Sequence, residues 1–269
     1  MTDIVMQAKG FTRFDFSDGH YSHPVYDKGH GPKVIVMHEL PGLTHTVLDF
    51  ADRLIAAGFR VYLPLLFGEL LDDAPVGNLA KLCISKEFGH LKAGTTAPVC
   101  DWLRALSREV QQQTPTTERV GAIGMCVTGA FVIPLILEDA VVTGVVSQPS
   151  IPFSAVYRAT GLGEGDWMRE MNVSDQDLFD AADCAADKDK HILVQRFIDD
   201  RLCPAARVQL IAERFDQQAE LHEYPSPTPH VAHPHAVLTE EYANAEPSDT
   251  DPTRIALQRV IEFLRVHLS

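Results

Sequence analysis

Positive charge is scarce in this sequence. Its 269 residues include 23 lysines and arginines against 37 aspartates and glutamates, which gives a formal net charge of -14, and the basic residues form no cluster. An acidic chain repels the phosphate backbone of nucleic acids and the headgroups of anionic lipids. We therefore expect that neither nucleic acid nor a membrane surface is a partner of this protein.

Long apolar runs are also missing. No stretch approaches the roughly 20 apolar residues that a helix needs to cross a bilayer. The first residues, MTDIVMQAKGFTRFDF, lack the apolar core of a signal peptide. We therefore expect a cytoplasmic protein.

Cysteine occurs only as five scattered residues, and no two of them form a CxxC pair. An odd number of widely spaced cysteines argues against a disulfide framework, and the missing pairs argue against a zinc knuckle. We expect most of these thiols to be reduced and to fill the core. The five are Cys83, Cys100, Cys126, Cys184 and Cys203.

The chain does contain enough apolar sequence for a large core. Hydrophobic residues make up 45% of it, and no internal repeat is visible. Because α/β folds of this length commonly form one domain, we expect a single domain over residues 1–269.

Short apolar runs of strand length alternate with segments of helical periodicity, which predicts an α/β fold with a mostly parallel sheet. Ser174 and Asp251 are suited to cap the helices that follow them, residues 68–90 are expected to be irregular, and residues 124–137 are expected to turn and then form a helix. The predicted strands are 33–37, 59–64, 119–123, 143–147, 192–197 and 219–224, and the other predicted helices are 46–57, 97–112, 175–186 and 252–268.

The segment GMCVTG, residues 124–129, places Cys126 between two glycines directly after a predicted strand. A strand, a tight turn with small neighbours and then a helix is the pattern of a nucleophile elbow, which exposes one side chain above the sheet. A buried cysteine among small residues can also be inert packing. A cysteine at the nucleophile position of an elbow indicates a thiol hydrolase.

Candidate acids and bases follow later strands. Asp199 and Asp200 come after the strand 192–197, and the segment 229–238 after the last strand contains His230, His233 and His235. The order nucleophile, acid, histidine is the chain order of α/β-hydrolases. The histidines could also suggest a metal site, but the segment has no carboxylate or cysteine at ligand spacing. We expect no metal and no cofactor.

Four motifs together resemble the dienelactone hydrolase family: HELPG at 38–42, GMCVTG at 124–129, DRLCP at 200–204 and HPHAVLT at 233–239. The resemblance runs from about residue 30 to the C-terminus. It implies an α/β-hydrolase fold, with a mostly parallel twisted sheet flanked by helices on both faces, and a carboxylic-ester or lactone hydrolase with a small-molecule substrate. No sequence pattern indicates an oligomeric state.

The same resemblance implies a catalytic triad of Cys126, His235 and Asp200, with Glu39 as a further carboxylate beside the thiol. The proline four residues after Asp200 favours this aspartate over Asp199, and His233 is the second candidate for the base.

The chemistry of a thiol hydrolase requires each of these groups. A free thiol is only a few per cent thiolate at neutral pH, so a base must activate it. His235 would be that base and would later activate water against the thioester, while Asp200 would fix the imidazole tautomer. The backbone N–H groups of Val127 and Leu40 are the expected oxyanion donors. The alternative is a non-enzymatic binding or redox-sensing protein whose Cys126 is merely oxidised.

Two positions depart from the family pattern. Thr128 stands where a glycine is usual in the elbow, and Thr239 stands where family members have an arginine that holds a substrate carboxylate. A hydroxyl cannot supply a bidentate, charge-assisted contact. We therefore expect neutral esters or lactones to be preferred over anionic ones, unless Arg201 or Lys86 supplies the missing cation. Segments 65–95 and 150–190 are expected to build the pocket.

Overall fold

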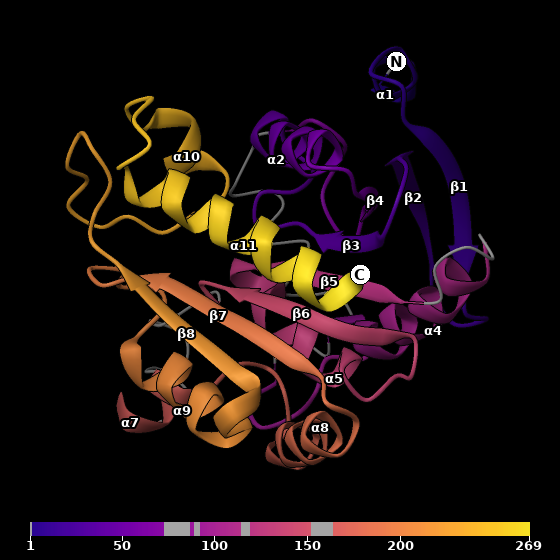
Figure 1. Cartoon of the computed structure of the whole chain (residues 1–269). Coiled ribbons are helices and arrows are strands. Elements are labelled where there is room, and N and C mark those ends of the chain that lie inside the picture. The colour runs from indigo at the N-terminus through magenta and orange to yellow at the C-terminus, as the bar shows by residue number, and fades with distance from the viewer. Residues whose placement is uncertain (1, 73–86, 89–91, 114–118, 152–163) are drawn as a thin grey trace.

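A mostly parallel sheet of eight strands forms the centre of the computed structural model, which describes residues 2–72, 87–88, 92–113, 119–151 and 164–269 (Figure 1). The strand order is β1-β2-β4-β3-β5-β6-β7-β8. The strands are β1 (Thr12–Ser17), β2 (Ser22–Gly29), β3 (Lys33–Met37), β4 (Arg60–Pro64), β5 (Val120–Met125), β6 (Val141–Ser147), β7 (His191–Phe197) and β8 (Ala219–Tyr224).

All six predicted strands are present as β3 to β8, and they pair in parallel. The sequence did not predict the antiparallel hairpin β1–β2, which extends the sheet through β2 and β4. At the edge of the sheet, β1 has no fully buried residue. Its sequence therefore lacks the continuous apolar run by which the central strands were recognised.

Helices cover both faces of the sheet, as predicted (Figure 1). The apolar side chains of α2 and α11 pack in one core cluster, and those of α4, α5, α8 and α9 pack in another. The helices are α1 (Thr2–Ala8), α2 (His45–Ala56), α4 (Val99–Gln112), α5 (Val132–Leu135), α7 (Glu164–Arg169), α8 (Asp175–Lys188), α9 (Ala205–Phe215), α10 (Glu240–Asn244) and α11 (Pro252–Leu268), with the 3-10 turns η2 (Cys126–Phe131) and η3 (Asp216–Gln218).

The central strands divide their side chains between the two clusters. Ile35 and Met37 belong to the cluster with α4 and α5, whereas Val34 and Val36 belong to the cluster with α2 and α11. Successive residues of a strand point to opposite faces, so a strand covered on both sides must be apolar throughout.

Helix ends agree with the predicted caps. The Ser174 hydroxyl accepts a hydrogen bond from the Asp177 N–H at 3.1 Å, and the Asp251 carboxylate accepts one from the Thr253 N–H at 2.9 Å. The segment after β5 turns and then forms a helix, as predicted: the 3-10 turn η2 comes first, and the short helix α5 follows.

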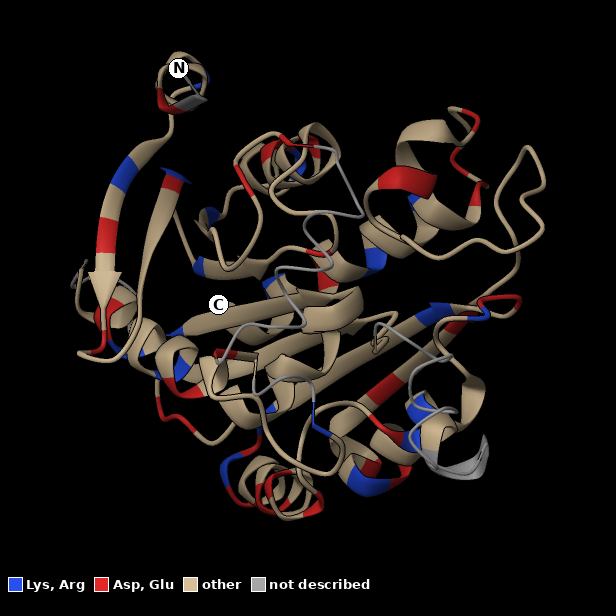
Figure 2. Ribbon diagram, turned by 180° about the vertical axis from the view of Figure 1, so that it is seen from behind, with Lys and Arg blue, Asp and Glu red and all other residues tan. Residues whose placement is uncertain are grey.

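The carboxyl ends of β3, β5, β6, β7 and β8 lie at the same edge of the sheet, because these strands are parallel. The loops that leave this edge carry the predicted site residues. In the view of Figure 2, acidic and basic residues of the described part of the chain are interspersed over the helices and loops.

Candidate active site

Cys126 lies at a strained turn at the end of β5. Its φ angle is +53°, in the left-handed region that a non-glycine residue rarely adopts. A Cβ atom on Gly124 would lie 2.2 Å from the Thr128 carbonyl oxygen, and one on Gly129 would lie 2.7 Å from the Pro149 Cα. Both glycines are therefore required sterically, as in the elbow pattern of the sequence.

Thr128, at the position where the family usually has glycine, ties the elbow to the neighbouring strand. Its hydroxyl lies 3.0 Å from the Met37 carbonyl oxygen at the end of β3 and 3.0 Å from the carbonyl oxygen of Met125. The Met125 N–H in turn donates to the Thr128 hydroxyl at 3.1 Å. Because this side chain closes a ring on the residue before the cysteine, it contributes to the tight first turn after β5.

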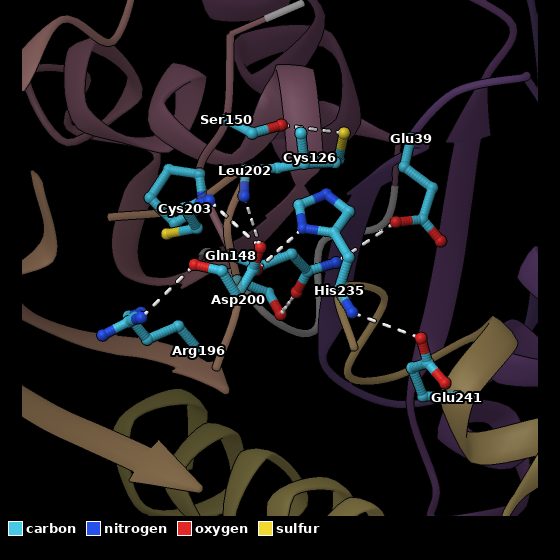
Figure 3. Close-up of polar contacts among 12 residues, drawn as sticks. Glu39, Cys126, Gln148, Ser150, Arg196, Asp200, Leu202, Cys203, His235 and Glu241 are labelled. Carbon is cyan, nitrogen blue, oxygen red and sulfur yellow. Dashed lines mark hydrogen bonds and ion pairs between the residues drawn. The ribbon is translucent and has the colours of Figure 1, made fainter. Parts of the chain in front are cut away.

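His235 lies between Asp200 and Cys126 (Figure 3). Its Nδ1 atom is 2.7 Å from one carboxylate oxygen of Asp200. The other oxygen of Asp200 accepts hydrogen bonds from the Leu202 N–H at 2.8 Å and the Cys203 N–H at 3.1 Å. The carboxylate is thus held by its own loop and can fix the orientation of the imidazole.

Burial alone would lower the pKa of His235, but the negative charge of Cys126, followed by the hydrogen bond to Asp200, raises that pKa well above its ordinary value. The Nε2 atom of His235 is buried and has no hydrogen bond of regular geometry within the described part of the chain. The hydrogen bond between a catalytic base and its nucleophile is often long or poorly aligned before a substrate binds.

The competing candidates lie elsewhere. Asp199 accepts a hydrogen bond from the Ser226 hydroxyl at 2.8 Å, while His230 and His233 are exposed. His38 is buried, and its Nε2 atom accepts a hydrogen bond from the Leu66 N–H at 3.0 Å. Burial lowers the pKa of His38 to about 4, so this neutral histidine orders the loop rather than serving as a base. The described residues include no group of three that could hold a metal ion.

Glu39 is buried, and both of its carboxylate oxygens accept hydrogen bonds. One comes from the Thr239 hydroxyl, and the other comes from the Gln148 side-chain amide at 3.1 Å. Within the described part of the chain, the hydrogen bonds of this carboxylate therefore go to these two groups and not to Cys126. Burial raises the pKa of Glu39, and the hydrogen bonds and the charge of His235 oppose the rise only in part.

Sequence reasoning missed the residues after β6. Gln148 binds Glu39, and the hydroxyl of Ser150 lies 3.0 Å from the Cys126 sulfur. Their position in the sequence could have indicated them, since polar residues directly after a buried parallel strand lie at the sheet edge where the loops with the other site residues meet.

A cleft of about 610 Å³ opens beside His235. Among the described residues that line it, three are glutamates and none is a lysine or an arginine. Leu40, one predicted oxyanion donor, lines the cleft, whereas Val127, the other, is the buried residue after Cys126 in the elbow. Arg201 is exposed on its loop, and Lys86 lies outside the described residues. The lining residues are Glu39, Leu40, Pro41, Thr44, His45, Thr46, His235, Ala236, Glu240 and Glu241.

The model of the dienelactone hydrolase family matches residues 22–268. The chain belongs to the dienelactone hydrolase family. The expected enzyme class, a carboxylic ester hydrolase of this type, is thereby confirmed. The match begins earlier than the sequence motifs did, because it includes the strand β2. No curated protein matches the chain by sequence.

Solved structures share the α/β-hydrolase fold at low identity. A cold-adapted esterase from an Arctic intertidal metagenomic library is 14% identical with a TM-score of 0.60, and the match covers 96% of this chain and 93% of that one. A putative dienelactone hydrolase from Klebsiella pneumoniae is 15% identical with a TM-score of 0.55, covering 95% and 97%. A dienelactone hydrolase-like promiscuous phosphotriesterase from metagenomic libraries is 15% identical with a TM-score of 0.58, covering 96% and 98%.

These likenesses confirm the predicted fold. None of the helices in the described residues is both long enough and apolar enough to span a bilayer.

Proposed function

We propose that this protein is a thiol-dependent carboxylic-ester or lactone hydrolase that works through a triad of Cys126, His235 and Asp200. The observation that carries the proposal is the 2.7 Å contact between His235 and Asp200 beside a cysteine at a strained turn. The raised pKa of His235 supports it further, because an imidazole that gains a proton readily is suited to take one from a thiol.

In the first half of the reaction, the Cys126 sulfur attacks the ester carbonyl carbon while His235 accepts the thiol proton. The carbonyl oxygen becomes an oxyanion, to which the backbone N–H groups of Val127 and Leu40 donate. The tetrahedral intermediate collapses, the carbon–oxygen bond to the leaving alcohol breaks, and His235 returns the proton to that oxygen. The product is a thioester on Cys126.

In the second half, His235 removes a proton from water, and the resulting hydroxide attacks the thioester carbonyl carbon. The carbon–sulfur bond then breaks, the carboxylic acid leaves, and the proton on His235 restores the thiol. Asp200 holds the imidazole in the tautomer that presents Nε2 to the sulfur and stabilises the imidazolium in both halves. In the resting protein the Glu39 carboxylate lies at the wall of the cleft, hydrogen-bonded to Thr239 and Gln148.

The substrate class follows from the charges around the cleft. Three glutamates line it, and Thr239 donates to Glu39 instead of facing a ligand. Among the described residues of the lining, a substrate carboxylate would find like charge and no guanidinium, so neutral esters or lactones fit the site better than anionic ones.

The test is turnover of a panel of esters and lactones by the wild type, by Cys126→Ala and by Cys184→Ala. Cys184 is a free, partly buried cysteine on α8, so its variant controls for loss of a thiol away from the cleft. We expect Cys126→Ala to lose turnover by about a thousandfold or more, with unchanged thermal melting, and Cys184→Ala to keep it.

Mass spectrometry of the enzyme during turnover should find the acyl group on Cys126. Activity retained by Cys126→Ala would remove this cysteine from the mechanism. An oxidised but never acylated Cys126 would favour the redox-sensing alternative.

A further inference from the structure

Besides His235, the hydroxyl group of Ser150 lies next to the proposed nucleophile, Cys126. The Ser150 hydroxyl oxygen lies 3.0 Å from the Cys126 sulfur, and both residues are buried, with 7% and 8% of their surfaces exposed. A hydroxyl can donate to a thiolate, and charge-assisted hydrogen bonds are shorter and stronger than neutral ones. The short separation therefore suits an O–H···S⁻ hydrogen bond.

The loop that carries Ser150 is fixed against the elbow at two points. The Ser150 N–H donates to the Cys126 carbonyl oxygen at 2.9 Å. Pro149 packs so close to Gly129 that even one added Cβ atom would lie 2.7 Å from its Cα. These contacts hold the backbone of Ser150 against the elbow, and from there its hydroxyl lies beside the sulfur.

Arg207 anchors the same loop from the far side. This fully buried residue of α9 donates to the carbonyl oxygens of Pro149 at 2.9 Å and Leu202 at 3.1 Å through Nη1, and to that of Trp167 at 2.9 Å through Nη2. One guanidinium therefore joins the loop of Ser150 to the loop that holds the acid Asp200. These hydrogen bonds fix the distance between the loop of Ser150 and the loop of Asp200.

We propose that Ser150 is a catalytic residue that donates a hydrogen bond to the Cys126 thiolate, on the side of the sulfur that His235 does not occupy. The inference rests on the proposed function, because it concerns the state of the nucleophile. It assigns a role to a loop that none of the motifs in the sequence includes.

The hydrogen bond acts at two stages. In the resting enzyme it stabilises negative charge on sulfur, so the thiolate forms at lower pH. When the thioester is hydrolysed, the carbon–sulfur bond breaks and charge returns to the sulfur, so a donor waiting at 3.0 Å stabilises the leaving thiolate. Loss of the hydroxyl should therefore slow deacylation more than acylation.

The titratable and charged groups that face Cys126 come from several elements. Among the described residues, Cys203 after β7, Arg207 on α9 and His235 after β8 interact electrostatically with Cys126. Glu39 after β3 and Asp200 after β7 interact with His235. A Ser150 variant leaves all of them in place, so a change in the titration of Cys126 reports the hydroxyl.

The experiment compares Ser150→Ala, Ser150→Thr and Ser107→Ala with the wild type. Ser107 is a buried serine on α4 whose hydroxyl donates to the Arg104 carbonyl oxygen at 2.7 Å, so it is a matched control outside the site. The rate of Cys126 alkylation by iodoacetamide is measured against pH, with the modified peptide identified by mass spectrometry. Thermal melting verifies that each variant is folded.

We expect the pH midpoint of alkylation to rise by about one unit in Ser150→Ala, a tenfold loss of thiolate below the midpoint. Ser150→Thr keeps a hydroxyl and should retain the wild-type midpoint, as should Ser107→Ala. During ester turnover, Ser150→Ala should accumulate acyl-enzyme, and kcat and KM should fall together by about tenfold while kcat/KM changes little, because kcat/KM does not include the deacylation step.

A midpoint in Ser150→Ala equal to that of Ser107→Ala would overturn the inference. So would an equal rise in the Ala and Thr variants, since that would assign the effect to packing. If Cys126→Ala is inactive while Ser150→Ala is unchanged, only the role of Ser150 fails. If Cys126→Ala remains active, the proposed function fails first.

Discussion

Replacing Glu39 by glutamine should stabilise the folded protein, and increasingly so as the pH rises. Burial is the largest influence on this carboxyl group and raises its pKa above the ordinary value of 4.5. A carboxyl group with a raised pKa binds its proton more tightly in the folded state than in the unfolded chain. Below pH 4.5 the carboxyl group is protonated in both states, so its raised pKa does not lower the free energy of unfolding. As the pH rises from 4.5 through the raised pKa, the free energy of unfolding falls.

The size of the effect follows from linkage. Between the ordinary and the raised pKa, the folded state retains a proton that the unfolded chain has released, so the free energy of unfolding falls by up to about 1.4 kcal/mol per pH unit. Glutamine carries no charge and can keep both contacts, by accepting from the Gln148 amide and donating to the Thr239 hydroxyl. The variant therefore loses the penalty without leaving a buried partner unsatisfied.

The assay is urea unfolding of the wild type and Glu39→Gln from pH 4 to pH 8. Titrating groups that do not interact with Glu39 cancel in the difference between the two proteins. The free energy of unfolding of the variant minus that of the wild type should be small at acid pH and should grow above about pH 4.5. It should level off once the pH passes the pKa of Glu39 in the folded state. Glu213→Gln, a change at an exposed glutamate of α9, is the control and should show no such growth.

A difference that shrinks or stays flat as the pH rises would refute this reasoning. It would mean that the hydrogen bonds from Thr239 and Gln148 outweigh burial and that Glu39 is held as a stabilised carboxylate.

Two further predictions concern turnover. His235→Ala should lower kcat/KM about as severely as Cys126→Ala, because triad members act as a unit, whereas the exposed His233 should tolerate alanine with little loss; measured kcat/KM values for the two variants decide this. For a matched pair of esters that differ only in a free carboxylate or its methyl ester, we expect the neutral one to react about ten- to a hundredfold faster in kcat/KM. Faster turnover of the anion would redirect attention to Arg201 and Lys86.

Much of the fold could be predicted from the sequence because the signals are local. The central strands contain continuous apolar runs, since they are covered on both faces, and Ser174 and Asp251 cap the helices that directly follow them. The elbow is local too, because Gly124, Cys126 and Gly129 lie within six residues and only glycine fits at its two crowded positions. The edge strand β1, which is partly exposed, lacks such a signal.

For the candidate site, the sequence could predict only which loops would meet, namely those that follow the parallel strands. Parallel strands bring their following loops to one edge, so a nucleophile, an acid and a histidine in that order could be expected to meet. The two adjacent aspartates are alike in sequence context, and the resemblance alone favoured Asp200. Their partners differ in the folded chain, where Asp200 contacts His235 and Asp199 contacts Ser226.

The tertiary structure alone decided what surrounds these groups. Thr239 donates to Glu39 from 200 positions away, and Ser150 reaches Cys126 across 24 positions. Such contacts depend on how closely the loops approach and on which way each side chain points, which no local pattern encodes. The sequence by itself therefore determined the order of elements and the type of chemistry. Packing at the sheet edge determined which hydroxyl meets the thiol and which groups surround the buried carboxylate.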